Sequence, residues 1–368
     1  MPTGDKLITV AIHTYEKAII LKTMLEREGI EVVIHNVNLI QPVISSGVRV
    51  RIHERDLPMA LQIIEAASVT EPASSVEPGA PRVLIPIDFS DYSLKACRLG
   101  LDFAYRIRGE AVLLHSYLND ALSGMLPFGS DEYEPEEPKL DTATLERVSR
   151  EKMEGLSEVI RAKIGSGDLP DVPFSTAIAE GIPENAILDY SKQLKPKVVV
   201  MGTRGRNRKE VLGSVTAEVL DAGKFPVLTV PENVALKSIE SIGTVVFLSI
   251  LNQQDMLSFD VFARSMGELP IKVVIIPVAD KRSTANMDRS LAGMLEYCRS
   301  RYPHYAFESR IIADREFVEE LDRYVTEAGV DLILIPNKKQ NIFTRLFSPS
   351  VAHRLVFHTD TPMLVVPV

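Results

Sequence analysis

The segment with the clearest chemical potential is the glycine-rich stretch VVVMGTRGRNRKEVLGSVTAEVL. An apolar run typical of a buried strand ends at Gly202, Gly205 follows, and Gly213 and Ser214 open a helical pattern. Glycines at a strand end let backbone N–H groups approach a phosphate closely, and the first turn of a helix adds unpaired N–H donors. The Ser214 hydroxyl can cap this helix or donate to a phosphate oxygen. The segment therefore predicts a phosphate-binding loop.

A carboxylate, that of Asp88, follows the apolar strand pattern RVLIPI. It can accept hydrogen bonds from ribose hydroxyls, or it can cap the helix that begins near Asp91, and both interpretations stay open. In open α/β sheets, ligands bind at the carboxyl ends of the strands, where the strand order reverses. We therefore expect Asp88 and the glycine loop to lie at the same edge of a sheet.

The elements that must position these groups alternate between strand and helix patterns over residues 82–232. Strands separated by helices favour parallel pairing through right-handed crossovers. Residues 243–368 repeat the same order, and the best internal match pairs FPVLTVPE with TPMLVVPV and KVVVMGT with DLILIPN. A duplicated α/β unit explains this pattern.

These motifs resemble the universal stress protein family, most completely over residues 82–232, which also contain the similar segment AEGIPENAIL. The resemblance implies an α/β fold with two Rossmann-like five-stranded parallel-sheet domains of strand order 3-2-1-4-5. It also implies a cytoplasmic stress-response protein. In ATP-binding members the aspartate contacts the nucleoside, a second-strand residue meets the adenine through its backbone, and the glycine loop holds the phosphates. The resemblance assigns these roles to Asp88, to Ser116 or Tyr117, and to Gly202, Gly205, Gly213, Ser214 and Val215.

The glycine loop departs from the family pattern in its length. Seven residues lie between Gly205 and Gly213, where the family has nine. A loop shorter by two residues reaches at most about 7 Å less, which either closes the phosphate cradle or tightens it. Basic side chains in and before the loop either supply charge to a phosphate or belong to a solvated loop; they are Arg204, Arg206, Arg208 and Lys209.

The second repeat lacks all three glycines of this pattern and the aspartate. Pro336, Lys339 and Pro349 fall where the glycines are expected, followed by Ser350, and Ile250 falls where the aspartate is expected. Proline also removes an N–H donor. We therefore expect ATP in the first repeat only, with the second repeat as a degenerate partner domain.

Residues 1–68 predict a small β-α-β-β-α domain that resembles a family of prokaryotic signal-transducing domains. His13, His35 and His53 lie on its strand patterns and are interpreted as structural. Residues 69–81 are rich in proline and serine and predict a linker. The predicted domains are thus 1–68, 82–232 and 243–368.

Composition and charge argue against several classes of function. The net charge of −9 argues against a general nucleic-acid binder, and the two cysteines, Cys97 and Cys298, have no spacing that suggests a metal site. No apolar run is long enough to span a bilayer, so we expect a cytoplasmic protein.

No common catalytic motif is present, and His115, in the middle of a strand pattern, is expected to pack and to form a hydrogen bond. Two main hypotheses remain: a nucleotide-dependent stress regulator and a nucleotide-independent interaction scaffold with unidentified protein partners. A slow ATPase is a weaker alternative. The last strands of the repeats, FPVLTVP and TPMLVVP, are expected to pair as an intramolecular pseudo-dimer, with further homodimerisation left open.

Overall fold

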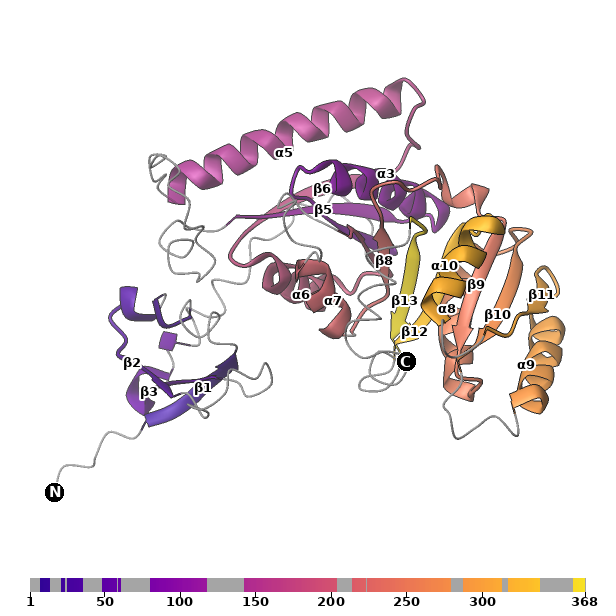
Figure 1. The fold of residues 1–368 in the computed structure, drawn as a ribbon. Helices are drawn as coiled ribbons and strands as arrows, with labels where there is room; N and C mark the ends of the chain where they lie inside the picture. The colour runs from indigo at the N-terminus through magenta and orange to yellow at the C-terminus, as the bar shows by residue number, and fades with distance from the viewer. Residues whose placement is uncertain are drawn as a thin grey trace. The chain divides into compact units, whose positions relative to one another are not determined.

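A computed structural model gives the architecture of the chain (Figure 1). It describes residues 7–13, 21–23, 25–35, 48–57, 59–60, 80–117, 142–203, 214–222, 224–278, 287–312, 317–337 and 360–367. The chain divides into two compact units. The first contains residues 1–70, 117–148 and 179–182, and the second contains residues 71–116, 149–178 and 183–368.

The amino-terminal part of the first unit has a three-stranded antiparallel sheet of order β1-β3-β2. Its strands are β1 (Leu7–His13), β2 (Val32–His35) and β3 (Val48–His53), followed by the 3-10 turn η1 (Glu54–Asp56). Helical residues 21–23 and 25–27 lie between β1 and β2, and Gly29 leaves this helix with a φ of 83°. The predicted order of elements agrees with the described residues. The linker lies outside them, except for its last two residues.

The first repeat contains five strands and four helices within the described residues. They are β4 (Arg82–Pro86), α3 (Asp91–Arg106), β5 (Glu110–Tyr117), α5 (Thr142–Gly165), β6 (Phe174–Glu180), α6 (Pro183–Leu194), β7 (Val198–Gly202), α7 (Ser214–Ala222) and β8 (Val227–Val230). The strand order is β6-β5-β4-β7-β8, which is the expected order 3-2-1-4-5. Gly109 lets the chain pass from α3 into β5, because a Cβ there would lie 2.1 Å from the Pro81 carbonyl oxygen.

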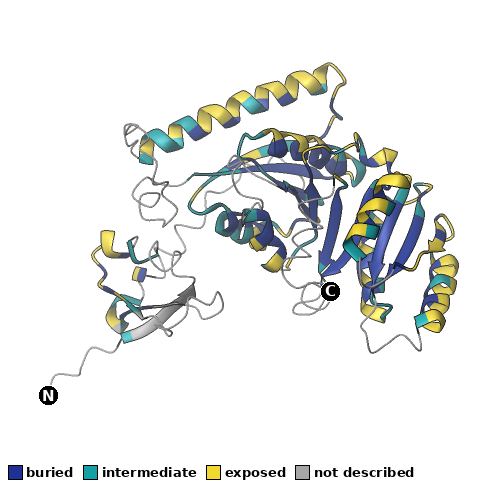
Figure 2. Ribbon diagram, in the orientation of Figure 1, coloured by how far each residue is buried: buried dark blue, intermediate teal, exposed yellow. Residues whose placement is uncertain are grey.

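The second repeat follows the short turn η2 (Ile239–Ser241) and has the same alternation of strands and helices. Its described elements are β9 (Thr244–Ser249), α8 (Gln253–Met266), β10 (Lys272–Pro277), α9 (Met287–Arg301), β11 (Ala306–Ser309), α10 (Phe317–Glu327), β12 (Leu332–Asn337) and β13 (Met363–Pro367). The order β11-β10-β9-β12-β13 is again 3-2-1-4-5. The continuous apolar runs of the sequence become buried strands, with the exposed faces on the helices (Figure 2).

The two repeats join edge to edge through β8 and β13 (Figure 1). These strands pair antiparallel, with Leu228 opposite Leu364 at the centre of the pairing. The result is one ten-stranded sheet, parallel within each repeat and antiparallel at the join. One hydrophobic core runs through both repeats, from Val83 to Val366. The predicted intramolecular pseudo-dimer is therefore confirmed, and it covers the edge that each repeat would otherwise expose.

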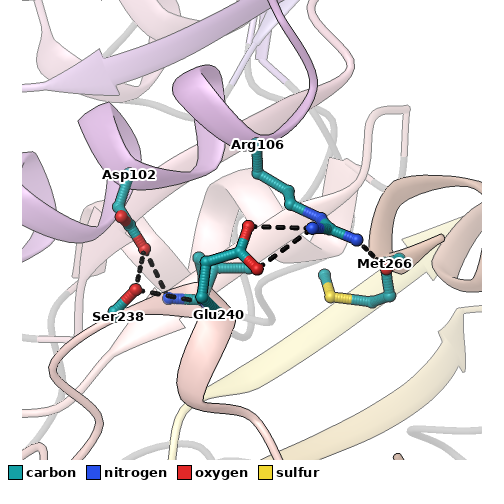
Figure 3. A network of polar contacts seen from close by, with 6 residues as sticks. Asp102, Arg106, Ser238, Glu240 and Met266 are labelled. Carbon is teal, nitrogen blue, oxygen red and sulfur yellow. Dashed lines mark hydrogen bonds and ion pairs between the residues drawn. The ribbon is translucent and has the colours of Figure 1, made fainter. Parts of the chain in front are cut away.

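A polar network ties α3 to the segment that connects the repeats (Figure 3). The Asp102 carboxylate accepts hydrogen bonds from the Ser238 hydroxyl, at 2.9 Å, and from the Ile239 backbone N–H. Arg106 donates through Nη1 to both carboxylate oxygens of Glu240, at 2.8 and 3.0 Å, and through Nη2 to the Met266 carbonyl. Because Met266 ends α8, one arginine of the first repeat contacts both the connection and the second repeat.

Candidate functional site

The turn after β4 holds Asp88 half-buried beside the start of α3. Oδ1 of Asp88 accepts hydrogen bonds from the Ser90 N–H, at 3.0 Å, and from the Ser90 hydroxyl, at 2.5 Å. Ser90 is the residue that caps α3, because its side chain accepts from the Ser93 N–H. Asp88 thus orients the cap rather than capping the helix itself. Within the described part of the chain, no residue is hydrogen-bonded to Oδ2, so that oxygen can accept from a ligand.

Aromatic and basic side chains lie around this turn, and one of them, His115, comes from the carboxyl end of β5. The Nδ1 atom of His115 lies 2.7 Å from the Ile87 carbonyl oxygen, and only a protonated Nδ1 can donate to a carbonyl. The ring of Phe89 packs 4.7 Å from the His115 ring, and the Lys152 ammonium lies 5.9 Å from the Phe89 centroid. His115 therefore packs and forms a hydrogen bond, as predicted from the sequence.

Ser116 and Tyr117, the two residues predicted to meet a base, are the last residues of β5 and are half-buried. The Tyr117 carbonyl accepts a hydrogen bond from the Gly181 N–H at 2.9 Å. That carbonyl thus ties the end of β5 to the segment after β6.

The strand that precedes the glycine loop ends as predicted, at Gly202 in β7. The Gly202 carbonyl accepts a hydrogen bond from the Thr216 hydroxyl at 2.8 Å, which ties the strand end to the first turn of α7. Ser214 is the first residue of α7, and Val215 is half-buried in the same turn. Gly205, Gly213 and the four basic residues of the loop (Arg204, Arg206, Arg208 and Lys209) lie outside the described residues.

The topology brings these groups to one edge of the sheet. β5 and β7 flank β4 and both run parallel to it, so Asp88, Ser116 and Gly202 follow strand ends that face the same way. The chain goes from β4 to β5 on one side and returns to β7 on the other, which makes β4 and β7 the point where strand order reverses. This is the place where open α/β sheets bind ligands.

The sheet register locates the corresponding residues of the second repeat. Gly202 pairs with Val230, and Pro336 pairs with Val366, the matching residue of β13. The prediction that Pro336 replaces Gly202 is confirmed by this pairing. Lys339, Pro349 and Ser350 lie outside the described residues.

The turns after β4 and β9 are equivalent in conformation. Phe89 and Leu251 have φ values of 61° and 60°, and each precedes the residue that caps the next helix, Ser90 or Asn252. Ile250 therefore occupies the position of Asp88, as predicted.

A buried carboxylate that the sequence analysis missed closes the turn of the second repeat. Asp255, fully buried, accepts hydrogen bonds through Oδ2 from the Ser249 hydroxyl, at 2.7 Å, and the Ile250 N–H, at 2.8 Å. In the first repeat, Ser93 takes this position and accepts from the Asp88 N–H at 3.4 Å. The sequence signal was the spacing from Asn252 to Asp255, a capping pattern in which Asn252 accepts the Asp255 N–H at 3.0 Å.

The two carboxyl edges also differ in exposure. In the first repeat, β5 ends in three half-buried residues and β7 ends in half-buried Gly202. In the second repeat, β9, β10 and β12 are buried to their last residue. The strand ends are thus more exposed in the first repeat than in the second.

The described residues contain neither a metal-binding cluster nor a membrane-spanning helix. Among the described residues, no group of three or more His, Cys, Asp and Glu side chains is arranged to hold a metal ion. None of the helices in the described ranges is both long and apolar enough to cross a bilayer.

Comparisons with known proteins agree with the duplicated architecture. The sequence model of the universal stress protein family matches residues 80–231 and 245–367. The chain is 28% identical over 151 residues to universal stress protein MJ0531 of Methanocaldococcus jannaschii, covering 40% of this chain and 81% of that protein. It is 23% identical over 174 residues to the stress response protein NhaX of Bacillus subtilis, covering 41% of this chain and 98% of that protein.

Among solved structures, a universal stress protein from Archaeoglobus fulgidus aligns with a TM-score of 0.54 at 17% identity, covering 78% of this chain and 96% of that one. The protein PA1789 from Pseudomonas aeruginosa, described as functionally unknown, aligns with a TM-score of 0.50 at 11% identity, covering 78% and 93%. At these identities the likeness concerns the fold.

Proposed function

The chain belongs to the universal stress protein family, with two copies of the family domain in tandem, and from that premise we propose that it is a cytoplasmic stress-response regulator that binds ATP or a related nucleotide in its first repeat only. Residues 1–68 form a separate domain in this proposal, joined by the linker 69–81 to the tandem repeats, and would add a second regulatory input.

One observation carries the proposal: the same edge of the sheet is built differently in the two repeats. The first repeat presents the Asp88 carboxylate, a glycine strand end and the start of α7 at half-buried positions. The second repeat has Ile250 and Pro336 in their place and a carboxylate beneath the turn. The Asp255 carboxyl group is bonded to the Ser249 hydroxyl and the Ile250 N–H, so it closes the turn from within.

The proposal gives each group of the first repeat a role. Oδ2 of Asp88 accepts from the ribose, and the backbone of Ser116 or Tyr117 meets the base. Gly202, Gly205 and Gly213 leave room for the phosphates, and the N–H groups of Ser214 and Val215 donate to them.

Calorimetric titration of the purified chain with ATP tests this proposal. We expect one saturable site per chain. Asp88→Ala should weaken binding at least about tenfold, since a hydrogen bond to a charged group contributes roughly 1.5–3 kcal/mol. Gly202→Val should also weaken it, because the added side chain projects into the phosphate cradle.

Asp91→Ala is the matched control, because Asp91 is an exposed aspartate in the first turn of α3 and has no role in the proposed site. It should lower stability by under about 1 kcal/mol and leave the affinity within about twofold. Two sites per chain, or unchanged binding in both Asp88→Ala and Gly202→Val, would contradict a site in the first repeat only.

The shortened glycine loop favours a second candidate, a nucleotide-independent interaction scaffold. No binding of ATP at millimolar concentration would support it, and the partner of residues 1–68 would then be the next object of study. A slow ATPase requires turnover that Asp88→Ala or Gly202→Val abolishes.

A further inference from the structure

Asn337, the last residue of β12 in the second repeat, contacts the first repeat. Its side chain is buried, and its Nδ2 donates a hydrogen bond to the carbonyl oxygen of Leu220 at 3.0 Å. Leu220 belongs to α7, the helix that follows the glycine loop. The donor and acceptor are 117 positions apart in the chain, so this bond joins the two repeats.

The accepting carbonyl lies where a helix needs an external donor. The last four carbonyl groups of an α-helix have no N–H partner within the helix, and Leu220 is among the last four residues of α7. The last turn of α7 also contains no basic residue that would complement the helix dipole. Asn337 therefore serves as a cap that the second repeat provides for a helix of the first.

The same helix is fixed at its other end within the first repeat. Thr216, in the first turn, donates to the Gly202 carbonyl at 2.8 Å. Two polar bonds thus tie α7 to the sheet, one to β7 near the start of the helix and one to β12 near its end. Ser214 and Val215, whose N–H groups the proposed function uses, begin this helix.

The sheet register identifies the residue of the first repeat that corresponds to Asn337. Val199 donates to the Pro226 carbonyl and Ile333 donates to the Pro362 carbonyl, so Thr203 corresponds to Asn337. The second repeat thus lacks the equivalents of Asp88 and Gly202. Its Asn337, one residue after Pro336, donates to α7 of the first repeat.

We infer that Asn337 is a positioning residue: through it the second repeat holds α7 of the first repeat in the orientation that the nucleotide site requires. The link to a nucleotide rests on the proposed function, whereas the positioning of α7 does not. The second repeat then supports the nucleotide site of the first repeat by holding the carboxyl-terminal end of α7.

The test uses the full chain with Asn337→Leu, which keeps a similar volume and removes the donor. The matched control is Thr229→Val, which removes a buried hydroxyl contact across the same join, from Thr229 Oγ1 to the Met363 carbonyl at 3.4 Å, and leaves the bond from Asn337 to Leu220 in place. Hydrogen–deuterium exchange, read by mass spectrometry, reports on α7 and on α3 separately. Asn337→Leu should speed exchange in α7 by about fivefold and leave α3 unchanged, as loss of one hydrogen bond predicts.

ATP titration on the same proteins gives the second readout. Asn337→Leu should raise the dissociation constant by about fivefold, and Thr229→Val should leave it within about twofold. Unchanged exchange in α7, equal acceleration in α3 and α7, or unchanged affinity despite a loosened α7 would overturn the inference. If the unaltered chain binds no ATP, the proposed function fails, and the exchange of α7 still decides whether Asn337 positions the helix.

A second variant guards against misfolding of the leucine protein. Asn337→Asp keeps the shape of the side chain but, when ionised, cannot donate to the Leu220 carbonyl. It should reproduce the faster exchange in α7, and normal exchange in that variant would contradict the role of the donor.

Discussion

At the scale of single residues, the two repeats differ by exchanges that change which groups are available to a ligand. Ser93 in the first repeat and Asp255 in the second both accept the backbone N–H at the strand end. The carboxylate of Asp255 also accepts the Ser249 hydroxyl, so it binds the turn more firmly. The exchange places a buried carboxyl group beneath the second turn, whereas the first turn has its carboxylate, Asp88, at a half-buried position.

Asp255→Ala should therefore be costly. It leaves the Ser249 hydroxyl and the Ile250 N–H without their acceptor, for a loss of about 2–3 kcal/mol in the free energy of unfolding. Asp91→Ala is the control, since Asp91 also lies in the first turn of its helix but is exposed, and should cost under about 1 kcal/mol. Urea unfolding followed by circular dichroism measures both, and equal losses would argue against the role of Asp255.

The two thiols provide another residue-scale prediction. Burial raises the pKa of Cys97 to about 12 and that of Cys298 to about 12. At pH 8 only roughly one thiol in ten thousand is then ionised, and the thiolate is the reactive form. Iodoacetamide should leave both thiols of the folded chain unmodified. In about 8 M urea at the same pH, which unfolds the chain, it should modify both cysteines. Rapid modification of the folded chain would show that one of the thiols is accessible.

At the scale of elements, helix α3 connects the repeats as well as covering the sheet. Asp102 and Arg106 lie one turn apart and bind consecutive parts of the connecting segment, which fixes how that segment leaves the first repeat (Figure 3). Arg106 also donates to the carbonyl that ends α8, a position where a cation is favourable. The join between the repeats is thus held by side chains in addition to the pairing of β8 with β13.

Arg106→Ala should lower the free energy of unfolding by about 1–2 kcal/mol. It removes a bidentate ion pair and a bond to a helix end, and the estimate is reduced because Glu240 is about half exposed, at 47%. Arg98→Ala, an exposed position on the same helix, should change it by less than about 0.5 kcal/mol. Chemical denaturation of both variants measures the difference, and similar values would show that the network adds nothing.

At the scale of the whole molecule, the two repeats share one sheet and one core, whereas the amino-terminal sheet has its own core. That smaller core includes Leu25, Ile30, Val50 and Ile52. A small core stabilises a domain less than a large one, because a smaller share of its surface is buried. The repeats should therefore behave as a single folding unit, distinct from residues 1–68.

Differential scanning calorimetry should accordingly show two transitions, the lower one from the amino-terminal domain. Removal of residues 1–79 should abolish the lower transition and leave the upper one within about 2 °C, since both repeats unfold together through their common core. Separate transitions for the two repeats would contradict a single cooperative unit.

The sequence by itself determined the repeated strand–helix order and the loss of Asp88 and Gly202 equivalents at Ile250 and Pro336, while the family resemblance supplied the strand order. The first two features are local, because buried strands are continuous apolar runs and because glycine and proline change the backbone at their own positions. Only the tertiary structure decided the side-chain contacts that join the repeats.

No local pattern encodes the bond from Asn337 to Leu220, or that from Ser238 to Asp102 across 136 positions. Their energy depends on where two distant segments lie once the shared sheet has formed. The burial of Asp255 is a similar case, since a carboxylate near a helix start suggests a cap, and only packing shows that it closes the turn from within. For that reason the residues of the proposed nucleotide site could be listed from the chain, while the contact of the second repeat with α7 required the fold.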